Sequence, residues 1–86
     1  MLYLVHLKRS AEKELAGLPR EVHRRIVKRL LALQGNPRPQ GAKKLGGGDA
    51  YRIRVGDYRV LYTIDDAFQK IEVSAVGHRR EVYRQD

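Results

Sequence analysis

Hydrophobic and polar residues change their spacing several times along the chain, and each change predicts a new element. Residues 2–7 form an apolar run without alternation, which is typical of a strand covered on both faces in the centre of a sheet. Stretches with helical spacing and then with strand spacing follow: the predicted helices are 11–16 and 19–34, and the predicted strands are 50–55, 58–65 and 70–76. The order β-α-α-β-β-β predicts an α+β fold, in which two helices pack on one face of a mostly antiparallel sheet.

The two predicted helices are bounded by residues that start or stop helices. Ser10 is placed to cap the first helix through its hydroxyl, and Gly17 ends it. Pro19 suits the first turn of the second helix. Along that helix an apolar stripe faces the core and basic residues fill the rest: Val22, Ile26, Leu30 and Leu33 against Arg20, Arg24, Arg25, Lys28 and Arg29. The basic residues form either a solvated outer face or a helix that binds a nucleic-acid groove.

A long connection, residues 35–49, separates the second helix from the later strands. The segment Gly35-Asn36-Pro37 ends the helix, because glycine and proline are typical of helix termination. The run Gly46-Gly47-Gly48 predicts a flexible entry to the next strand. It is not a phosphate-binding P-loop, since no helix pattern follows and no Lys-Ser/Thr pair closes the motif.

The dipeptide Gly56-Asp57 predicts a two-residue hairpin loop, which sets the register of the strands on either side. In that register Arg54 lies opposite Arg59, and Arg52 lies opposite Leu61. Directly opposed side chains lie on the same face of a sheet. The three arginines are therefore expected together on the solvent face, while the alternate residues face the helices: Tyr51, Ile53, Val55, Tyr58, Val60 and Tyr62.

Three arginines on one face favour an anionic ligand. Like charges directly opposite each other destabilise a sheet by about a few tenths of a kcal/mol or more. A phosphate that bridges the guanidinium groups would offset that cost. In the alternative, purely structural interpretation, Asp57 or Glu72 neutralises the arginines.

Composition extends the same picture to the whole chain. The 86 residues form one domain, 1–86, with 18 Lys or Arg against 10 Asp or Glu and a formal net charge of +8, which favours polyanionic partners. The lack of cysteine excludes disulfides and thiolate zinc sites. No stretch approaches the roughly 18 apolar residues of a membrane helix, and nothing resembles a signal peptide. We expect a cytoplasmic protein with no membrane partner.

The last predicted strand ends at Val76-Gly77 and delivers His78, Arg79 and Tyr83 near a sheet edge. Because we expect the glycine to break the strand, alternation does not tell whether these side chains reach the arginine face. If they do, that face combines guanidiniums, an imidazole and a phenol. Such a set suits RNA cleavage by a 2′-hydroxyl, which needs charge stabilisation and proton-transfer groups. The reaction needs no metal or other cofactor, and the sequence has no clustered carboxylates to hold a metal.

Three segments in this order carry a family resemblance over essentially the whole chain: KKLG at 43–46, YRIRVGDYRVLY at 51–62 and VGHRREVYR at 76–84. Together they resemble the RelE/ParE superfamily of bacterial toxins, specifically the RelE-like mRNA interferases. The resemblance implies the toxin of a type II toxin–antitoxin pair, which enters the ribosomal A site and cuts mRNA by 2′-hydroxyl attack, leaving a 2′,3′-cyclic phosphate. It implies as partners a cognate antitoxin, in a hetero-oligomer, and the ribosome with its mRNA.

The resemblance assigns roles to Arg52, Arg54, Arg59, Arg79 and Tyr83, and the chemistry of the residues themselves adds His78 and the basic contacts. The predicted catalytic set is Arg52, Arg54, Arg59, Arg79, Tyr83 and His78, and the predicted contacts to RNA or ribosome are Lys43, Lys44, Arg24 and Lys28. Some family members have lysine at the positions of Arg52 and Arg54, and an arginine is a poor proton shuttle because it stays protonated. Tyr83 and His78 are therefore the candidates for the general base, and Tyr83 has the alternative role of stacking on a nucleobase.

Two other functions stay open at the level of the sequence. The ParE-like branch shares the fold but binds DNA gyrase and does no RNA chemistry, so it would not need the arginines and Tyr83 together. A non-catalytic RNA-binding module would use an exposed aromatic platform for stacking bases. The sequence lacks such a platform, which favours the nuclease.

Overall fold

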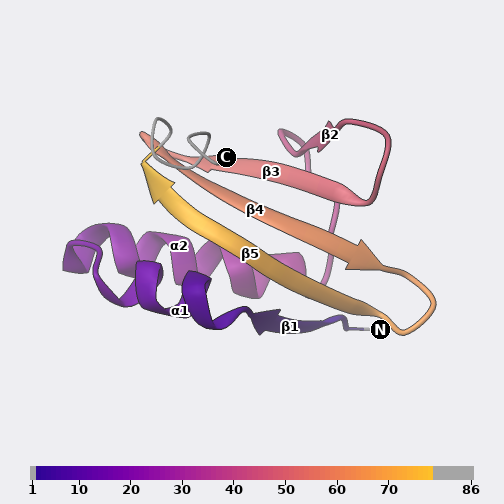
Figure 1. The fold of residues 1–86 in the computed structure, drawn as a ribbon, viewed down its shortest axis with the longest axis horizontal. Helices are drawn as coiled ribbons and strands as arrows, with labels where there is room; N and C mark the ends of the chain where they lie inside the picture. Colours follow the sequence, from indigo (N-terminus) through magenta and orange to yellow (C-terminus); the bar gives the residue numbers. More distant parts are fainter. Residues whose placement is uncertain (1, 79–86) are drawn as a thin grey trace.

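Five strands form one sheet in the order β1-β5-β4-β3-β2, and two helices cover one of its faces (Figure 1). The structure is a computed structural model that describes residues 2–78. In chain order the elements are β1 (Leu4–Leu7), α1 (Arg9–Ala16), α2 (Arg20–Leu33), β2 (Lys43–Leu45), β3 (Ala50–Val55), β4 (Tyr58–Asp65) and β5 (Lys70–His78). The parallel pair is β1 with β5, and the other neighbours are antiparallel. The predicted α+β architecture is confirmed.

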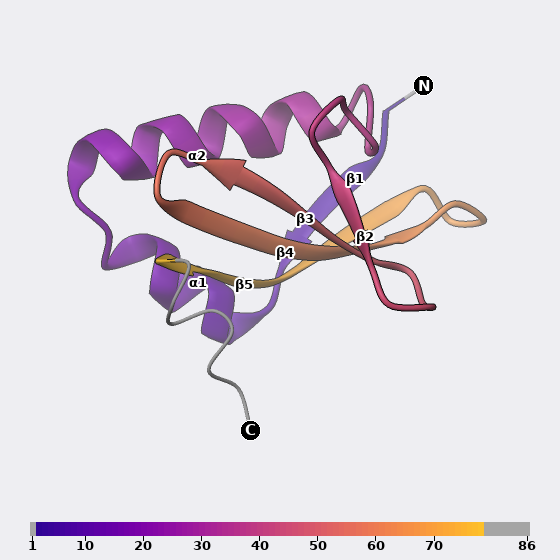
Figure 2. The same cartoon turned by 90° about the horizontal axis from the view of Figure 1, so that it is seen from above.

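Each helix buries an apolar stripe against the sheet. The buried residues recur at helical spacing: Ala11 and Leu15 in α1, and Ile26, Leu30 and Leu33 in α2. α1 packs on β5, while α2 runs along the β3 side of the sheet, as the view from above shows (Figure 2). Neither helix has the length and apolar character to cross a membrane, nor does any other helix within residues 2–78.

The helix starts differ partly from the prediction. α1 begins at Arg9, one residue before Ser10, and no side chain of the described residues caps its first turn. The predicted cap is therefore wrong, and Ser10 lies inside the helix. α2 begins at Arg20 directly after Pro19. This start agrees with the prediction to within one residue.

The β3–β4 hairpin has the predicted register. Val55 pairs with Tyr58 around the Gly56-Asp57 turn, and Arg54 lies opposite Arg59. Gly56 has a φ of 62°, a conformation that favours glycine. The helix-facing positions of the two strands supply much of the core, namely Ile53, Val55, Val60, Tyr62 and Ile64.

The first strand lies at an edge of the sheet, so the prediction of a central strand is wrong. Among the strands of residues 2–78, β1 pairs with β5 alone. Val5 and Leu7 pack against the core, but Leu4 is 61% exposed and His6 is exposed as well. The apolar run of β1 therefore has one face that packs on the core and a second face on which an apolar side chain, Leu4, is exposed to solvent.

The long connection 35–49 contains a strand that the sequence did not predict. β2 pairs antiparallel with the start of β3 and forms the second edge of the sheet. Three residues are too few to display an alternation. The segment before β2 is tied to the sheet by the buried Tyr62 hydroxyl, which donates a hydrogen bond of 2.8 Å to the carbonyl oxygen of Pro37. Burial raises the pKa of Tyr62 to about 12.

A bulge interrupts the pairing of β4 with β5. The register shifts between Leu61 and Tyr62, and Ser74 is the extra residue, with its hydroxyl donating to the carbonyl oxygen of Leu61 at 3.3 Å. The bulge lets Val73 and Val76 both face the core although they are three residues apart. Without a bulge, residues three apart in a strand point to opposite faces.

β5 also continues past the point where we expected it to break. Gly77 pairs with Arg59, and His78 pairs with Tyr58. The prediction that Gly77 ends the strand is therefore wrong. Because the pairing is regular here, the register settles on which face His78 lies, as described below.

Candidate nucleic-acid interface

Basic side chains gather at one end of the sheet face that the helices leave open. Lys43 lies opposite Arg52, and Arg54 lies opposite Arg59, so all four side chains belong to this face. We call these four residues, Lys43, Arg52, Arg54 and Arg59, the basic end. They come from β2, β3 and β4, which are neighbours in the sheet. The three arginines share one face, as the hairpin register predicts.

The three arginines of the basic end differ in exposure. Arg54 is exposed and Arg52 is half-buried, whereas Arg59 is only 5% exposed. The expectation that all three face solvent is therefore wrong for Arg59. Its Nε atom is buried without a hydrogen-bond partner, and it forms no ion pair within residues 2–78. A buried charged group whose donor has no acceptor lowers the stability of the folded protein. A bound anion would supply that acceptor.

A pocket opens beside the basic end, where β2 stops pairing with β3. Its volume is about 330 Å³, and we call it the basic pocket because Arg29, Lys43, Arg52 and Arg54 line it together with Gly41. Arg29 comes from α2, and its Nη1 donates a hydrogen bond of 3.2 Å to the carbonyl oxygen of Arg54. The last pair between β2 and β3 is Lys43 with Arg52. Arg29 therefore occupies the β3 edge that β2 leaves open.

Sequence reasoning missed Arg29, although a signal for it exists. Arg25 and Arg29 are four residues apart and directly precede the buried Ile26 and Leu30, so both flank the apolar stripe of α2. A side chain on the flank of a stripe extends along the sheet instead of away from it. Arg25 does the same at the hairpin turn, where its guanidinium lies 3.7 Å from the place that a Cβ would take on Gly56.

Three other predicted contacts lie away from the basic end. Arg24 and Lys28 are two positions on either side of the buried Ile26, which puts them on the outer face of α2, and both are exposed. Lys44 lies opposite Tyr51, on the helix side of the sheet. Of the predicted RNA or ribosome contacts, the structure brings only Lys43 together with the arginines.

His78 lies on the helix side of the sheet as well. It pairs with Tyr58, and the two rings contact edge to face with centroids 5.8 Å apart. Tyr58 packs against the core, and opposed residues share a face, so the His78 side chain points away from Arg54 and Arg59. Arg79 and Tyr83, the other two predicted catalytic residues, lie outside the residues that the structure describes.

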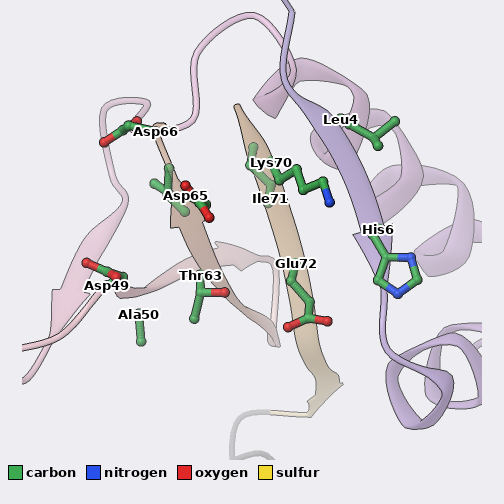
Figure 3. Close-up of a pocket in the computed structure, with 11 residues that line it drawn as sticks. Leu4, His6, Asp49, Ala50, Thr63, Asp65, Asp66, Lys70, Ile71 and Glu72 are labelled. Atoms are coloured by element: carbon green, nitrogen blue, oxygen red, sulfur yellow. The ribbon is translucent and has the colours of Figure 1, made fainter. Parts of the chain in front are cut away.

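The opposite end of the open face is acidic (Figure 3). A hollow of about 900 Å³ lies there, between β1, β3, β4 and β5. We call its four carboxylates, Asp49, Asp65, Asp66 and Glu72, the acidic end. Glu72 stands beside His6 in Figure 3, as the pairing of β5 with β1 requires. The open face therefore carries opposite charges at its two ends.

One carboxylate of the acidic end is held by partners within the fold. Arg38 donates to both oxygens of Asp66, with Nη2–Oδ2 at 2.8 Å and Nη1–Oδ1 at 3.3 Å, and the Tyr3 hydroxyl donates to Oδ1 at 2.7 Å. The hydrogen bonds from Arg38 and then from Tyr3 hold the pKa of Asp66 below its ordinary value of 3.8. The same carboxylate raises the pKa of the Tyr3 hydroxyl.

The sequence and the fold of this chain are similar to those of known bacterial and archaeal proteins. Residues 5–83 match the family described as the ParE toxin of type II toxin-antitoxin systems, parDE. A putative RelE-like toxin protein of Escherichia coli is 33% identical over 81 residues, which cover 92% of this chain and 85% of that protein. Toxin RelE of Mycobacterium tuberculosis is 30% identical over 84 residues, 95% of this chain and 87% of its own length. The archaeal RelE–RelB complex from Pyrococcus horikoshii has a chain with 32% identity and a TM-score of 0.83, covering 99% of this chain and 100% of that one.

The chain therefore belongs to the RelE/ParE superfamily of toxins from type II toxin–antitoxin systems. Within that superfamily it is a RelE-like toxin, since its relatives in sequence and in structure carry that name. The family resemblance of the three sequence segments is confirmed. The family match includes every strand and helix described above except the first residue of β1.

Proposed function

We propose that this toxin is an endoribonuclease that cuts mRNA in the ribosomal A site without a metal ion. The 2′-hydroxyl oxygen attacks the adjacent phosphorus, the bond from phosphorus to the 5′-oxygen breaks, and a 2′,3′-cyclic phosphate remains. A general base takes the proton of the 2′-hydroxyl, and the leaving 5′-oxygen takes up a proton. Negative charge builds on the phosphoryl oxygens in the transition state, and fixed cations stabilise it.

The observation that carries this proposal is the pair formed by Arg54 and Arg59. The two residues lie directly opposite each other, where like charges repel. Neither forms an ion pair within residues 2–78, and the buried Nε of Arg59 has no acceptor. Such a pair destabilises the protein alone but is stabilised by a bound anion. A phosphodiester offers both the negative charge and the acceptor oxygens.

The different exposure of the basic residues indicates which of them contact the RNA phosphates and which stabilises charge from inside the fold. Arg54 and Arg52 reach solvent and contact the reacting phosphate, while Lys43 and Arg29 hold a neighbouring phosphate in the basic pocket. Arg59 is buried and supplies a charge whose position is set by the fold. A charge that needs no reorganisation during the reaction stabilises the transition state more effectively than a mobile one.

Proton transfer requires a group outside the arginines, because a guanidinium stays protonated. By family resemblance we assign Tyr83 as the general base and Arg79 as a further donor to the phosphate. His78 is the second choice for the base. Its position beside Tyr58 on the helix side makes it the weaker candidate.

We also propose that the toxin binds a cognate antitoxin in the cytoplasm and forms a hetero-oligomer with it. Similar structures from Pyrococcus horikoshii and Mycobacterium tuberculosis are toxin–antitoxin complexes. The net charge of +8 favours an acidic antitoxin that covers the basic end. Association that is steered by charge slows as the salt concentration rises.

A second candidate function is the binding of DNA gyrase, because the matching family bears the ParE name. A gyrase-directed toxin would do no RNA chemistry. The basic end would then only bind a partner, and the toxin would not need proton-transfer groups such as Tyr83.

An assay on programmed ribosomes separates the two candidates. Purified toxin is added to ribosomes that carry a defined mRNA, cleavage is mapped by primer extension, and gyrase supercoiling is measured in parallel. Cleaved mRNA with a 2′,3′-cyclic phosphate, seen only when ribosomes are present, supports the nuclease. Intact mRNA together with inhibited gyrase contradicts it. Arg54→Ala should lose cleavage, whereas Arg20→Ala, which removes the same charge at the start of α2, should not.

A further inference from the structure

Arg38 connects the acidic end of the open face with the basic pocket, and we propose that it is a positioning residue for RNA binding. Asp66 and Tyr51 hold Arg38, and Arg38 in turn keeps residues 39–43 in place, so that Gly41 and Lys43 form their wall of the basic pocket. This inference rests on the proposed function, because it takes the basic pocket to be a site for RNA phosphate.

Every nitrogen of the Arg38 guanidinium has a partner. Nη1 and Nη2 donate to the two oxygens of Asp66, and Nε donates to the Tyr51 hydroxyl at 3.0 Å. The guanidinium carbon also lies 5.3 Å from the centre of the Tyr51 ring. A forked contact to a carboxylate defines both the position and the orientation of an arginine, which a single bond does not. We call Arg38, Asp66 and Tyr51 the Arg38 clamp.

A second anchor lies next to the clamp in the sequence. The carbonyl oxygen of Pro37 accepts the hydrogen bond from the buried Tyr62 hydroxyl. The rings of Tyr62 and Tyr51 are stacked with centroids 6.0 Å apart. Two consecutive residues, Pro37 and Arg38, are thus fastened to neighbouring strands by two tyrosines that support each other.

A short, ordered path leads from the clamp to the basic pocket. The amide of Ala42 donates to the carbonyl oxygen of Pro39 at 3.0 Å, which closes a turn. Gly41, in that turn, has a φ of 100° and lines the pocket. Lys43 follows and pairs with Arg52. Since β2 has only three residues and lies at an edge, its own pairing holds it weakly, and the clamp is a further tether of this segment.

The role of the clamp can be tested by whether a substitution in it raises or lowers the Kd for RNA. Asp66→Asn removes one negative charge and the forked contact. Asp49→Asn, in the same acidic end, removes the same charge, but Asp49 forms no side-chain hydrogen bond within residues 2–78. Charge alone predicts tighter RNA binding for both variants. If the clamp positions the pocket, Asp66→Asn instead raises the Kd by about threefold to tenfold.

The probe is a single-stranded RNA oligonucleotide with 2′-O-methyl groups, which cannot be cut, and the Kd is measured by fluorescence anisotropy at one salt concentration. Arg38→Lys keeps the positive charge but cannot make the forked contact. It should therefore weaken binding as Asp66→Asn does. If Asp66→Asn binds RNA as tightly as Asp49→Asn, the inference is overturned.

Amide hydrogen exchange supplies a readout that needs no RNA. In Asp66→Asn the amides of residues 41–45 should exchange faster than in the wild type, while those of β4 keep their rates. Faster exchange with unchanged RNA binding would make the clamp a purely structural feature and would also overturn the inference. A wild-type protein that binds this oligonucleotide no more tightly than Arg54→Ala would overturn the assignment of the basic pocket to RNA phosphate, and the inference with it, whereas the proposed cleavage is decided separately by the assay on programmed ribosomes.

Discussion

The two ends of the open sheet face carry opposite charges, and they differ in how the charged side chains are arranged. At the acidic end, Asp66 is paired with Arg38, and Lys70 lines the same hollow as the carboxylates. At the basic end, Arg54 faces Arg59, and neither has an ion pair within residues 2–78. Charge that the fold pairs with its opposite supports the structure. At the basic end two like charges lie directly opposite each other and one of them, Arg59, is buried, so a bound anion would offset a cost that the acidic end does not carry, which is why the basic end is the candidate site.

The largest effect should come from removing the buried charge of the basic end. We expect Arg59→Ala to reduce mRNA cleavage about 100-fold or more, because it deletes a fixed donor to the transition state. Lys70→Ala removes the same charge at the acidic end and should cut mRNA at the wild-type rate. Cleavage rates on programmed ribosomes measure both, and circular dichroism checks that the variants fold. Equal cleavage rates for the two variants would contradict the assignment of the catalytic site to the basic end.

The next effect concerns the segment that joins the two ends. Tyr62→Phe leaves the carbonyl oxygen of Pro37 without its buried donor, which should lower the free energy of unfolding by about 1–3 kcal/mol. Tyr58→Phe is the matched control, since the Tyr58 hydroxyl makes no hydrogen bond within the described residues. Chemical denaturation measures both variants.

The raised pKa of Tyr62 gives the same prediction a pH dependence. The neutral phenol is favoured in the folded protein, where its pKa is about 12, against 10.0 ordinarily. The stability from Tyr62 is therefore complete below pH 10 and decreases as the pH rises from 10 toward 12. Tyr62→Phe should lack this part of the alkaline loss, and an unchanged alkaline loss would contradict the assignment.

A smaller effect should separate the two ends by their salt dependence. Arg54→Ala removes one phosphate contact, so the slope of log Kd against log salt should decrease by about one. Asp65→Asn, at the acidic end, should leave the slope unchanged. Anisotropy titrations with the uncleavable RNA at several salt concentrations measure both slopes. A change of slope in Asp65→Asn would show that RNA reaches the acidic end.

The smallest expected effect is the release of the Arg38 clamp in acid. The pKa of Asp66 is lowered by Arg38, so its contribution is complete above pH 3.8 and is lost as the pH falls through the lowered pKa. The amide signals of Gly41 and Lys43 should shift in that range, as measured by NMR. The shift should be absent in Asp66→Asn. Its persistence there would mean that another group releases the segment.

The parts of the fold that follow from local chemistry could be predicted from the sequence. The Gly56-Asp57 turn defines its own register, so Arg54 opposite Arg59 followed from two residues. Three features did not follow, because each depends on distant partners. The edge position of β1 depends on its pairing with β5 at the other end of the chain, β2 depends on the edge of β3, and the bulge at Ser74 depends on the register between β5 and β4.

The candidate site was predictable to a similar extent. The register gave the shared face of Arg52, Arg54 and Arg59, but alternation cannot tell which of the side chains on that face is buried, and Arg59 is. Arg29 and the Arg38 clamp were out of reach for another reason. Their partners, the Arg54 carbonyl and Asp66, lie more than twenty residues away in the chain.

The pairing of β1 with β5 places Leu4 beside Lys70 and so has a consequence for how the protein matures. β3, β4 and β5 follow one another through short turns, and such local contacts form early, whereas a contact between distant residues pays the entropy of closing a long loop. On a translating ribosome β1 has no strand to pair with until β5 has emerged, whereas β3 and β4, which carry the three arginines, can already pair with each other. The strand order thus makes the β1–β5 pair, and with it the complete sheet, one of the last parts of the fold to form.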